Sequence, residues 1–172
     1  NGNGPWVDWG GTLTPDVSTA QSFSGSNSLA LSVNSAGADN AYGSDVYATT
    51  LDPGGVLSSW VWTVSYQLYL EAGFSGRAEM YISQVAMDGT GAGFVDGLWI
   101  RGTEAGTIDL ANTTATANPA LVYDAWVPVE LVIALGADTA TASYNGSQFY
   151  SGVWDVGTTG TPGIGGINFW GD

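Results

Sequence analysis

The sequence of 172 residues contains no cysteine, no histidine and no lysine. Without cysteine there is no disulfide framework, no thiolate nucleophile and no thiolate metal ligand. Without histidine, a Ser-His-Asp triad and a histidine-ligated zinc site are excluded, and without lysine there is no Schiff-base nucleophile. Carboxylates are therefore the main groups left for acid–base chemistry.

Positive charge is almost as scarce, because Arg77 and Arg101 stand alone against sixteen Asp and Glu residues. The net charge of −14 repels phosphate backbones and anionic lipids, so we expect no nucleic-acid partner and no membrane-surface binding. No run approaches the roughly 18 apolar residues that a membrane-spanning helix needs, so we expect no membrane insertion. The N-terminus has no signal-peptide character. The acidic composition, rich in Gly, Ser and Thr, predicts a mature extracellular protein, secreted or held at the cell surface.

Alternation of apolar and polar residues with a period of two dominates the chain, and no segment keeps a helical stripe over three turns. The clearest strand is predicted at residues 60–71, where the even positions from Trp60 to Leu70 form a continuous apolar row. A turn at residues 73–76 leads into an alternating strand at residues 78–87. Further strands are predicted at residues 28–34, 45–51, 94–101, 107–110, 127–135, 139–144, 147–153 and 166–170. In the first of these, Leu29, Leu31 and Val33 are predicted to point inward.

Two local signals refine this pattern. Asn145-Gly146 lies between two predicted strands and is a strong hairpin signal, because both central residues of such a turn adopt positive φ. Pro128 has no backbone N–H for a ladder, so it is predicted near a strand start or on a sheet edge. Many short strands separated by Gly- and Asn/Asp-rich turns are typical of an all-β fold, a two-sheet antiparallel sandwich or jelly roll.

Three stretches carry a family likeness: Phe23–Leu31, Trp126–Leu131 with the following residues 140–146, and Gly166–Gly171. They resemble, in turn, the G-x-x-S-L early strand, the W-x-x-V and Y-x-N-G pairing, and the penultimate strand of concanavalin A-like and laminin-G-like domains of bacterial extracellular proteins. The resemblance implies a concanavalin-like jelly roll over residues 1–172, similar to carbohydrate-binding modules. We expect this sandwich to lack the family's first and last strands, which pair with each other and supply calcium ligands in some relatives.

Aromatic residues suggest a binding function, because eight Trp and eight Tyr exceed what a core of this size needs. Sugars pack their C–H faces on aromatic rings and bond planar polar groups through their hydroxyls. If the strands predicted at residues 60–71, 78–87 and 94–101 are neighbours, they form one sheet. One face of that sheet then carries Gln67, Tyr69, Glu79, Tyr81, Trp99 and Arg101. We therefore predict a non-catalytic, lectin-like module that binds a polysaccharide or glycan there. The alternative is that these aromatic rings fill a packed second side and that Glu79 and Arg101 form an ordinary cross-strand ion pair.

Oxygen-rich turns offer candidate ligands for Ca²⁺, although no cofactor is required. The candidate ligands are Asp39, Asp45, Asp88 and Asp96. None of them follows the D-x-[DN]-x-[DN]-G pattern, and Asp in a Gly-rich turn is also ordinary turn chemistry.

Two other functions stay open. A structural or adhesive surface protein, such as a filament subunit, would self-associate by accepting a neighbour's strand at an open sheet edge. An enzyme would need a carboxylate pair, or a glutamic-peptidase-like pair of Glu79 with Gln84 or Gln67. The Glu-x-Asp-x-x-Glu run of glycosidases that resemble this fold does not occur, so we expect no catalysis.

Overall fold

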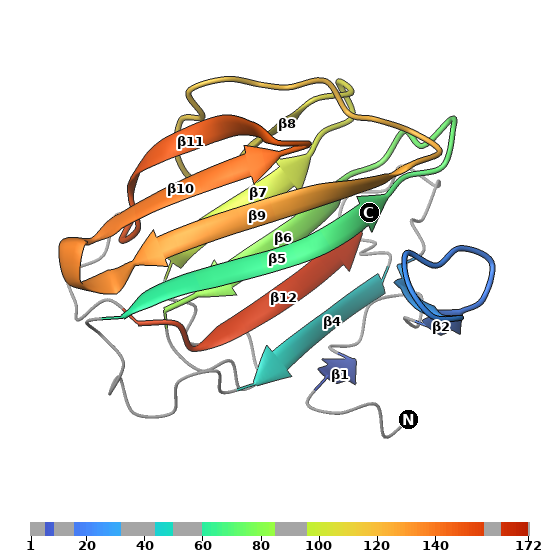
Figure 1. The fold of residues 1–172 in the computed structure, drawn as a ribbon, viewed down its shortest axis with the longest axis horizontal. Coiled ribbons are helices and arrows are strands. Elements are labelled where there is room, and N and C mark those ends of the chain that lie inside the picture. The colour runs from blue at the N-terminus through green and yellow to red at the C-terminus, as the bar shows by residue number, and fades with distance from the viewer. Residues whose placement is uncertain are drawn as a thin grey trace.

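The computed structural model describes residues 6–8, 16–31, 44–49, 60–84, 96–156 and 163–171, with the backbone alone at residues 6–8, 16, 44–49 and 96. Two antiparallel sheets dominate these residues and face each other as the layers of a sandwich (Figure 1). The larger sheet runs in the order β1 (Trp6–Asp8), β4 (Ser44–Thr49), β12 (Gly166–Gly171), β6 (Ala78–Ser83), β7 (Asp96–Gly102) and β8 (Ile108–Leu110).

The smaller sheet has four strands and is built mainly from the second half of the chain. Its order is β11 (Ser147–Val153), β10 (Thr139–Tyr144), β9 (Trp126–Ala134) and β5 (Val61–Tyr69), with one 3-10 turn, η1 (Leu135–Ala137), between β9 and β10. A separate two-stranded sheet pairs β2 (Asp16–Ser18) with β3 (Ser28–Ala30). The predicted all-β, two-sheet antiparallel jelly-roll sandwich is confirmed. No helix in the described ranges is long and apolar enough to cross a membrane.

The core lies between the two large sheets, and alternation along each strand decides which side chains enter it. On β9, the residues Val127, Val129, Leu131 and Ile133 are at most 3% exposed, while the intervening residues point outward. From the larger sheet, β6, β7 and β8 contribute the buried residues Met80, Ile82, Leu98, Ile100, Ile108 and Leu110. On these strands the other residues, including Glu79 and Tyr81, therefore lie on the face turned away from the core.

Two predictions about strand ends and faces are wrong. The strand predicted at residues 60–71 begins at Val61, and the side chain of Trp60 is 58% exposed because it precedes the strand. Leu29, predicted to point inward, is 46% exposed because β3 pairs with β2 outside the two layers of the sandwich. Of the remaining predicted strands, those at residues 139–144 and 147–153 match β10 and β11, and the others differ in their end positions.

The hairpin between β10 and β11 has the predicted turn, with φ of 49° at Asn145 and 74° at Gly146. Pro128 lies near the start of β9, as predicted, and its carbonyl accepts a hydrogen bond of 2.9 Å from the N–H of Asn145. This contact is at the end of the β9–β10 ladder, so the donor that proline lacks is not needed.

Replacing Gly146 by alanine isolates the backbone cost of this turn. A Cβ added there has no atom within 4 Å, so no clash contributes. We expect a loss of about 1 kcal/mol in the free energy of unfolding, because a Cβ disfavours positive φ. Urea unfolding measures it, with Ser147→Ala, at the exposed neighbouring residue, as the control. An equal effect in both variants would contradict the assignment.

Candidate functional site

Four of the six predicted sugar-binding residues lie together on the larger sheet. Glu79 and Tyr81 on β6 are the cross-strand partners of Arg101 and Trp99 on β7. All four lie on the face turned away from the core, because their neighbours Met80 and Ile100 are core residues.

The other two predicted residues, Gln67 and Tyr69, are not on this face. They belong to β5, which pairs with β9 in the smaller sheet and not with β6. A turn lies at residues 71–74, two residues before the predicted position of 73–76, with Phe74 N–H donating to the carbonyl of Glu71 at 3.0 Å. It carries the chain across to the opposite sheet instead of back along the same one. The prediction that all six residues share one sheet is therefore wrong.

The last strand completes the face that carries Glu79. Asn168 and Trp170 on β12 are the cross-strand partners of Tyr81 and Glu79. The outer face of β12, β6 and β7, here named the polar face, thus comprises Asn168, Trp170, Glu79, Tyr81, Ser83, Trp99 and Arg101. Asn168 and Trp170 were not among the predicted site residues.

Burial of polar groups singles out this region. In the part of the chain whose side chains are described, the buried polar residues are Glu79 (4% exposed), Ser83 (0%), Gln84 (6%) and Asn168 (6%). Three of them lie on the polar face, and Gln84 directly follows β6, where its amide donates to Asp155 at 3.0 Å. The buried Oδ1 of Asn168 has no hydrogen-bond partner among the described residues. Burying polar atoms costs free energy, and a sheet that needed only packing would carry apolar residues there.

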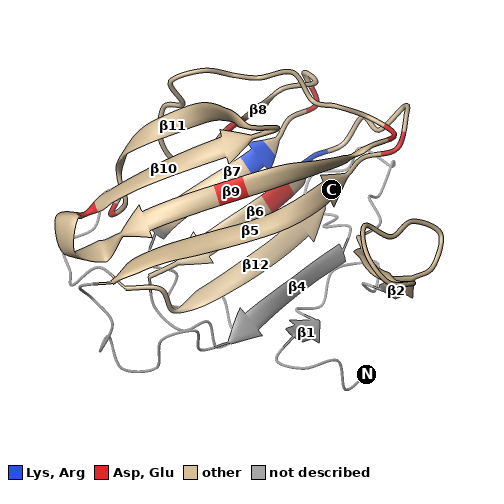
Figure 2. Ribbon diagram, viewed as in Figure 1, with Lys and Arg blue, Asp and Glu red and all other residues tan. Residues whose placement is uncertain are grey.

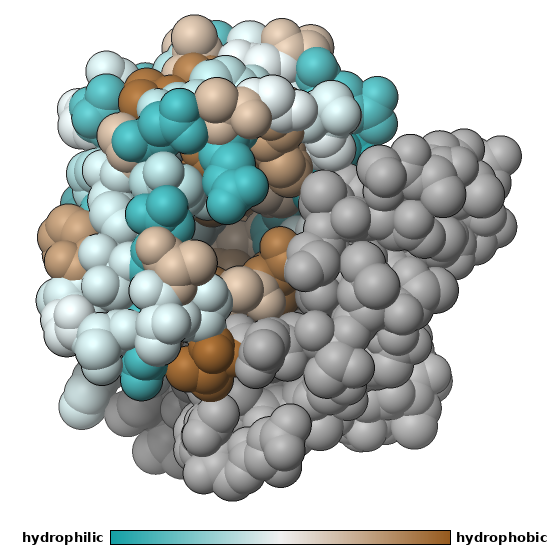
Figure 3. Space-filling model, turned by 90° about the vertical axis from the view of Figure 1, so that its right-hand side faces the viewer, coloured by the Kyte–Doolittle hydropathy of each residue, from teal (hydrophilic) through white to brown (hydrophobic). Residues whose placement is uncertain are grey.

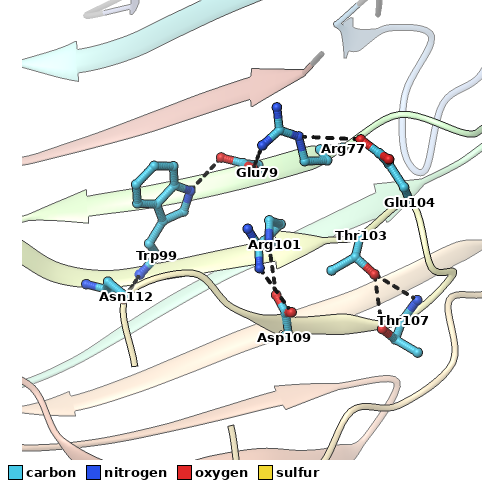
Figure 4. Close-up of polar contacts among 9 residues, drawn as sticks. All are labelled: Arg77, Glu79, Trp99, Arg101, Thr103, Glu104, Thr107, Asp109 and Asn112. Atoms are coloured by element: carbon cyan, nitrogen blue, oxygen red, sulfur yellow. Dashed lines mark hydrogen bonds and ion pairs between the residues drawn. The ribbon is translucent and has the colours of Figure 1, made fainter. Parts of the chain in front are cut away.

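Glu79 is the central charged group of the polar face. The indole Nε1–H of Trp99 donates to its Oε2 at 2.6 Å, and Nη1 of Arg77 lies 4.0 Å from its Oε1 (Figure 4). Nε of Arg77 also lies 4.0 Å from Oε1 of Glu104. The side chain of Glu79 is 1% exposed, whereas those of Arg77 and Glu104 are 38% and 70% exposed. A buried carboxylate is therefore held between an indole N–H and a guanidinium that reaches solvent.

The second arginine has a different partner. Arg101 donates to both oxygens of Asp109 on β8, at 3.1 and 3.2 Å. This bond raises the pKa of Arg101 further above its usual value, so the guanidinium stays charged and fixed in place. Glu79 and Arg101 are cross-strand partners, as the alternative interpretation requires, but Nε and Nη2 of Arg101 donate to Asp109 and not to Glu79. Both basic residues of the chain thus lie beside Glu79, on β7 and just before β6 (Figure 2).

Aromatic rings gather around the same carboxylate. The ring centroids of Trp99 and Trp170 are 6.0 Å apart with an angle of 36°, and Tyr81 meets Trp99 edge-on at 5.8 Å. The guanidinium of Arg77 lies 5.9 Å from the ring centroid of Trp170. Asn112 fixes the backbone of Trp99 by accepting from its N–H at 3.2 Å (Figure 4). Trp99 and Trp170 are half-buried.

The end of the sandwich where β6 begins and β7 and β12 end is hollowed (Figure 3). Hydrophobic and hydrophilic residues lie side by side in and around this hollow. Arg77 and Glu104 belong to this end of the molecule, because they immediately precede β6 and follow β7. These two charged residues therefore lie at the end of the sandwich that Figure 3 shows.

Gln67 and Tyr69 lie on the outer face of the smaller sheet, where Tyr69 belongs to a second aromatic group. Tyr69 and Trp126 are cross-strand partners with ring centroids 5.3 Å apart, and Phe23 meets Trp126 at 6.3 Å. Phe23 is 60% exposed. The predicted sugar-binding residues therefore divide between two aromatic groups on opposite faces of the sandwich.

Two of the four predicted calcium ligands fall within the described residues. Asp39 and Asp88 lie outside the described residues, whereas Asp45 lies in β4 and Asp96 begins β7, with the backbone alone described at both. Within the described ranges, no three Asp, Glu, His or Cys residues are grouped so as to hold a metal ion. A calcium site stays a prediction.

No protein-family model matches the chain, and no curated protein matches it. Solved structures share its fold. A sialidase aligns with a TM-score of 0.56 and 15% identity over 77% of this chain, which spans 11% of the sialidase chain. The carbohydrate-binding module CBM66 from Bacillus subtilis aligns with a TM-score of 0.50 and 11% identity, over 96% of this chain and 88% of the module. A tetrameric galectin from the ball sponge Cinachyrella sp. aligns with a TM-score of 0.44 and 15% identity, over 73% of this chain and 87% of the galectin. At such identities the first two likenesses are likenesses of fold.

Proposed function

We propose that the chain is a non-catalytic, extracellular carbohydrate-binding module whose ligand binds at the polar face. The observation that carries the proposal is the burial of Glu79, Ser83 and Asn168 beside the half-buried rings of Trp99 and Trp170. Binding sites for small polar ligands combine apolar rings with a few well-placed polar groups. The Bacillus subtilis module, which shares the fold, is by its name a carbohydrate-binding protein, and this supports the same class of ligand here.

Each group has a separate task in this proposal. The Trp99 and Trp170 rings offer apolar surface to the C–H face of a sugar. The guanidinium of Arg77, whose side chain is 38% exposed, donates to ring or hydroxyl oxygens of the sugar, and the buried carboxylate of Glu79 holds Arg77 and Trp99 in place. The bond from Trp99 Nε1 to Glu79 holds an aromatic and a polar contact in a fixed relative position.

Glu79 suits binding better than acid–base catalysis. Glycosidases use two carboxyl groups, one of which must carry a proton to act as the general acid. Arg77 lies between Glu79 and Glu104, so a guanidinium stands between these two carboxylates. A catalytic pair instead needs the scissile bond of the sugar between its two members.

Replacing Trp99 by alanine tests the site. We expect the affinity for the best ligand found on a glycan array to fall by about three- to tenfold or more, since an aromatic contact contributes roughly 0.5–1.5 kcal/mol beyond its buried area. Isothermal titration calorimetry measures the change. Tyr69→Ala, in the aromatic group on the opposite face, is the matched control and should change affinity less than about twofold.

Two outcomes would contradict the proposal. One is that the wild-type protein binds no glycan or polysaccharide although its thermal melt shows that it is folded. The other is that Tyr69→Ala weakens binding while Trp99→Ala does not, which would move the ligand to the smaller sheet.

A second candidate function is a structural or adhesive surface protein that assembles through sheet edges. One observation favours it: among the described strands, β5 is an edge strand of nine residues with no charged side chain. Such edges are uncommon on monomeric proteins because they invite pairing with another strand.

A further inference from the structure

The outer strands of the two sheets differ in how well they are protected. β1 and β8, the edges of the larger sheet, have three residues each. β11 is longer, but its register with β10 shifts between Ala142 and Ser143, and the carbonyl of Phe149 accepts from the N–H and hydroxyl of Thr116 at 2.8 and 2.9 Å. Short length, irregular register and a covering loop are the usual ways to prevent strand addition.

β5 has none of these protections. Its pairing with β9 runs without a bulge from Val61–Ala134 to Tyr69–Trp126. It contains no proline and no charged residue. In the described part of the chain, no strand pairs with its other side.

Along β5, the backbone N–H and C=O groups of successive residues point alternately toward β9 and toward the open side of the strand. The carbonyl of Trp60 accepts from the N–H of Leu135 at 3.2 Å, which fixes the even-numbered residues as those bonded to β9. The odd-numbered residues therefore turn their N–H and C=O groups toward the open side. They are Val61, Thr63, Ser65, Gln67 and Tyr69.

The open side of β5 also exposes part of the core. Tyr66 packs on Phe169 of β12 at 5.1 Å, so the next position in the smaller sheet would lie over β4 (Figure 1). The described residues place no strand in that position. The inward residues Trp62, Val64 and Leu68 are only half-buried, although their partners on β9 are buried. The buried Nε1–H of Trp62 has no acceptor among the described groups.

We propose that β5 accepts one extended strand from another protein, with apolar residues at alternate positions and no net negative charge. The added strand would bond the odd-numbered residues of β5 and cover the row that includes Trp62 and Val64. A second copy of this chain is disfavoured as the donor of the strand, because both copies would carry a net charge of −14. A segment rich in acidic residues is disfavoured by the net charge of −14.

A labelled synthetic peptide tests the proposal. The peptide has the same length as β5, alternates valine with threonine and carries one lysine at each end. Fluorescence anisotropy should show saturable binding, and a peptide of the same composition with its valines consecutive should bind at least about tenfold more weakly. Amide exchange measured by NMR should slow at Thr63, Ser65 and Gln67 when the peptide is added. The even-numbered amides, already bonded to β9, should change little.

A pair of proline variants provides the matched test. Ser65→Pro removes an outward N–H from β5, and Ser151→Pro removes an outward N–H from β11; both serines are exposed. We expect Ser65→Pro to weaken peptide binding by at least about tenfold and Ser151→Pro by less than about twofold. Thermal melts of both variants establish that the sandwich is folded.

The inference is independent of the sugar-binding proposal, because Trp99→Ala should leave peptide binding unchanged. Absence of saturable binding by the folded wild-type protein would overturn it, and so would equal effects of the two proline variants. Concentration-dependent dimers in size-exclusion chromatography that Ser65→Pro abolishes would also overturn it, by showing that β5 pairs with a second copy.

Discussion

Replacing Trp154 by alanine should lower the free energy of unfolding by about 3–5 kcal/mol, the range for removing a large buried aromatic side chain. Trp154 follows β11 and is 0% exposed. Its Nε1–H donates to the carbonyl of Gly163 at 3.2 Å. A Cβ built at Gly97 on β7 would lie 2.6 Å from Cζ2 of Trp154 and 2.5 Å from the carbonyl oxygen of Ile82. The indole that follows β11 of the smaller sheet therefore packs directly on Gly97 of β7 in the larger sheet.

The size of this loss follows from the lack of any group that could refill the space. Gly97 has no side chain, and the chain has no disulfide to hold the sheets together. A domain is stable by only about 5–15 kcal/mol, so this substitution removes a large part of the total. Urea unfolding followed by circular dichroism measures it. Trp60→Ala, at a tryptophan that is 58% exposed, is the control and should change stability by less than about 0.5 kcal/mol. Similar losses in both variants would contradict the bridging role of Trp154.

The sequence was sufficient to predict the faces of the strands but not which strands are neighbours. Alternation along residues 127–135 predicts which side chains of β9 are buried, because successive residues of a strand point to opposite sides. Alternation contains no information about pairing over long distances. The turn predicted at residues 73–76 is compatible both with a hairpin and with a crossing between sheets, and the chain crosses. That single difference separates Tyr69 from Tyr81.

The same limit explains the residues missing from the predicted site. Arg77 precedes Glu79 by two residues, so the alternation on β6 already places both on one side. Asn168 and Trp170 alternate with Ile167 and Phe169, which pack in or against the core. The side of the strand to which Asn168 and Trp170 point could therefore be predicted from the sequence. Their position beside β6 was not, because it depends on a contact between segments far apart in the chain.

Replacing Glu79 by glutamine should reduce affinity for the glycan by about ten- to a hundredfold. The neutral amide no longer holds the guanidinium of Arg77, whose hydrogen bonds to the sugar involve a charged group and contribute roughly 1.5–3 kcal/mol. Each 1.4 kcal/mol corresponds to about tenfold in affinity. Glutamine keeps the shape and one carbonyl oxygen, so the bond from Trp99 Nε1 and the fold should persist. Titration calorimetry with the array-selected glycan measures the affinity, and a thermal melt establishes that the variant is folded.

Glu130→Gln is the matched control, because it removes one carboxylate charge from the outer face of the smaller sheet, where Glu130 is exposed and pairs with Ser65 and Ser143. It should leave affinity within about twofold of the wild type. Equal losses in the two variants would mean that net charge, not the Glu79 carboxylate, controls binding.

The pair also separates binding from catalysis. An enzyme that used Glu79 as an acid or base would cleave the glycan in its wild-type form, and its Glu79→Gln variant would keep the affinity while losing the product. A binding module shows the reverse: no product from the wild type, and an affinity that depends on the charge at Glu79.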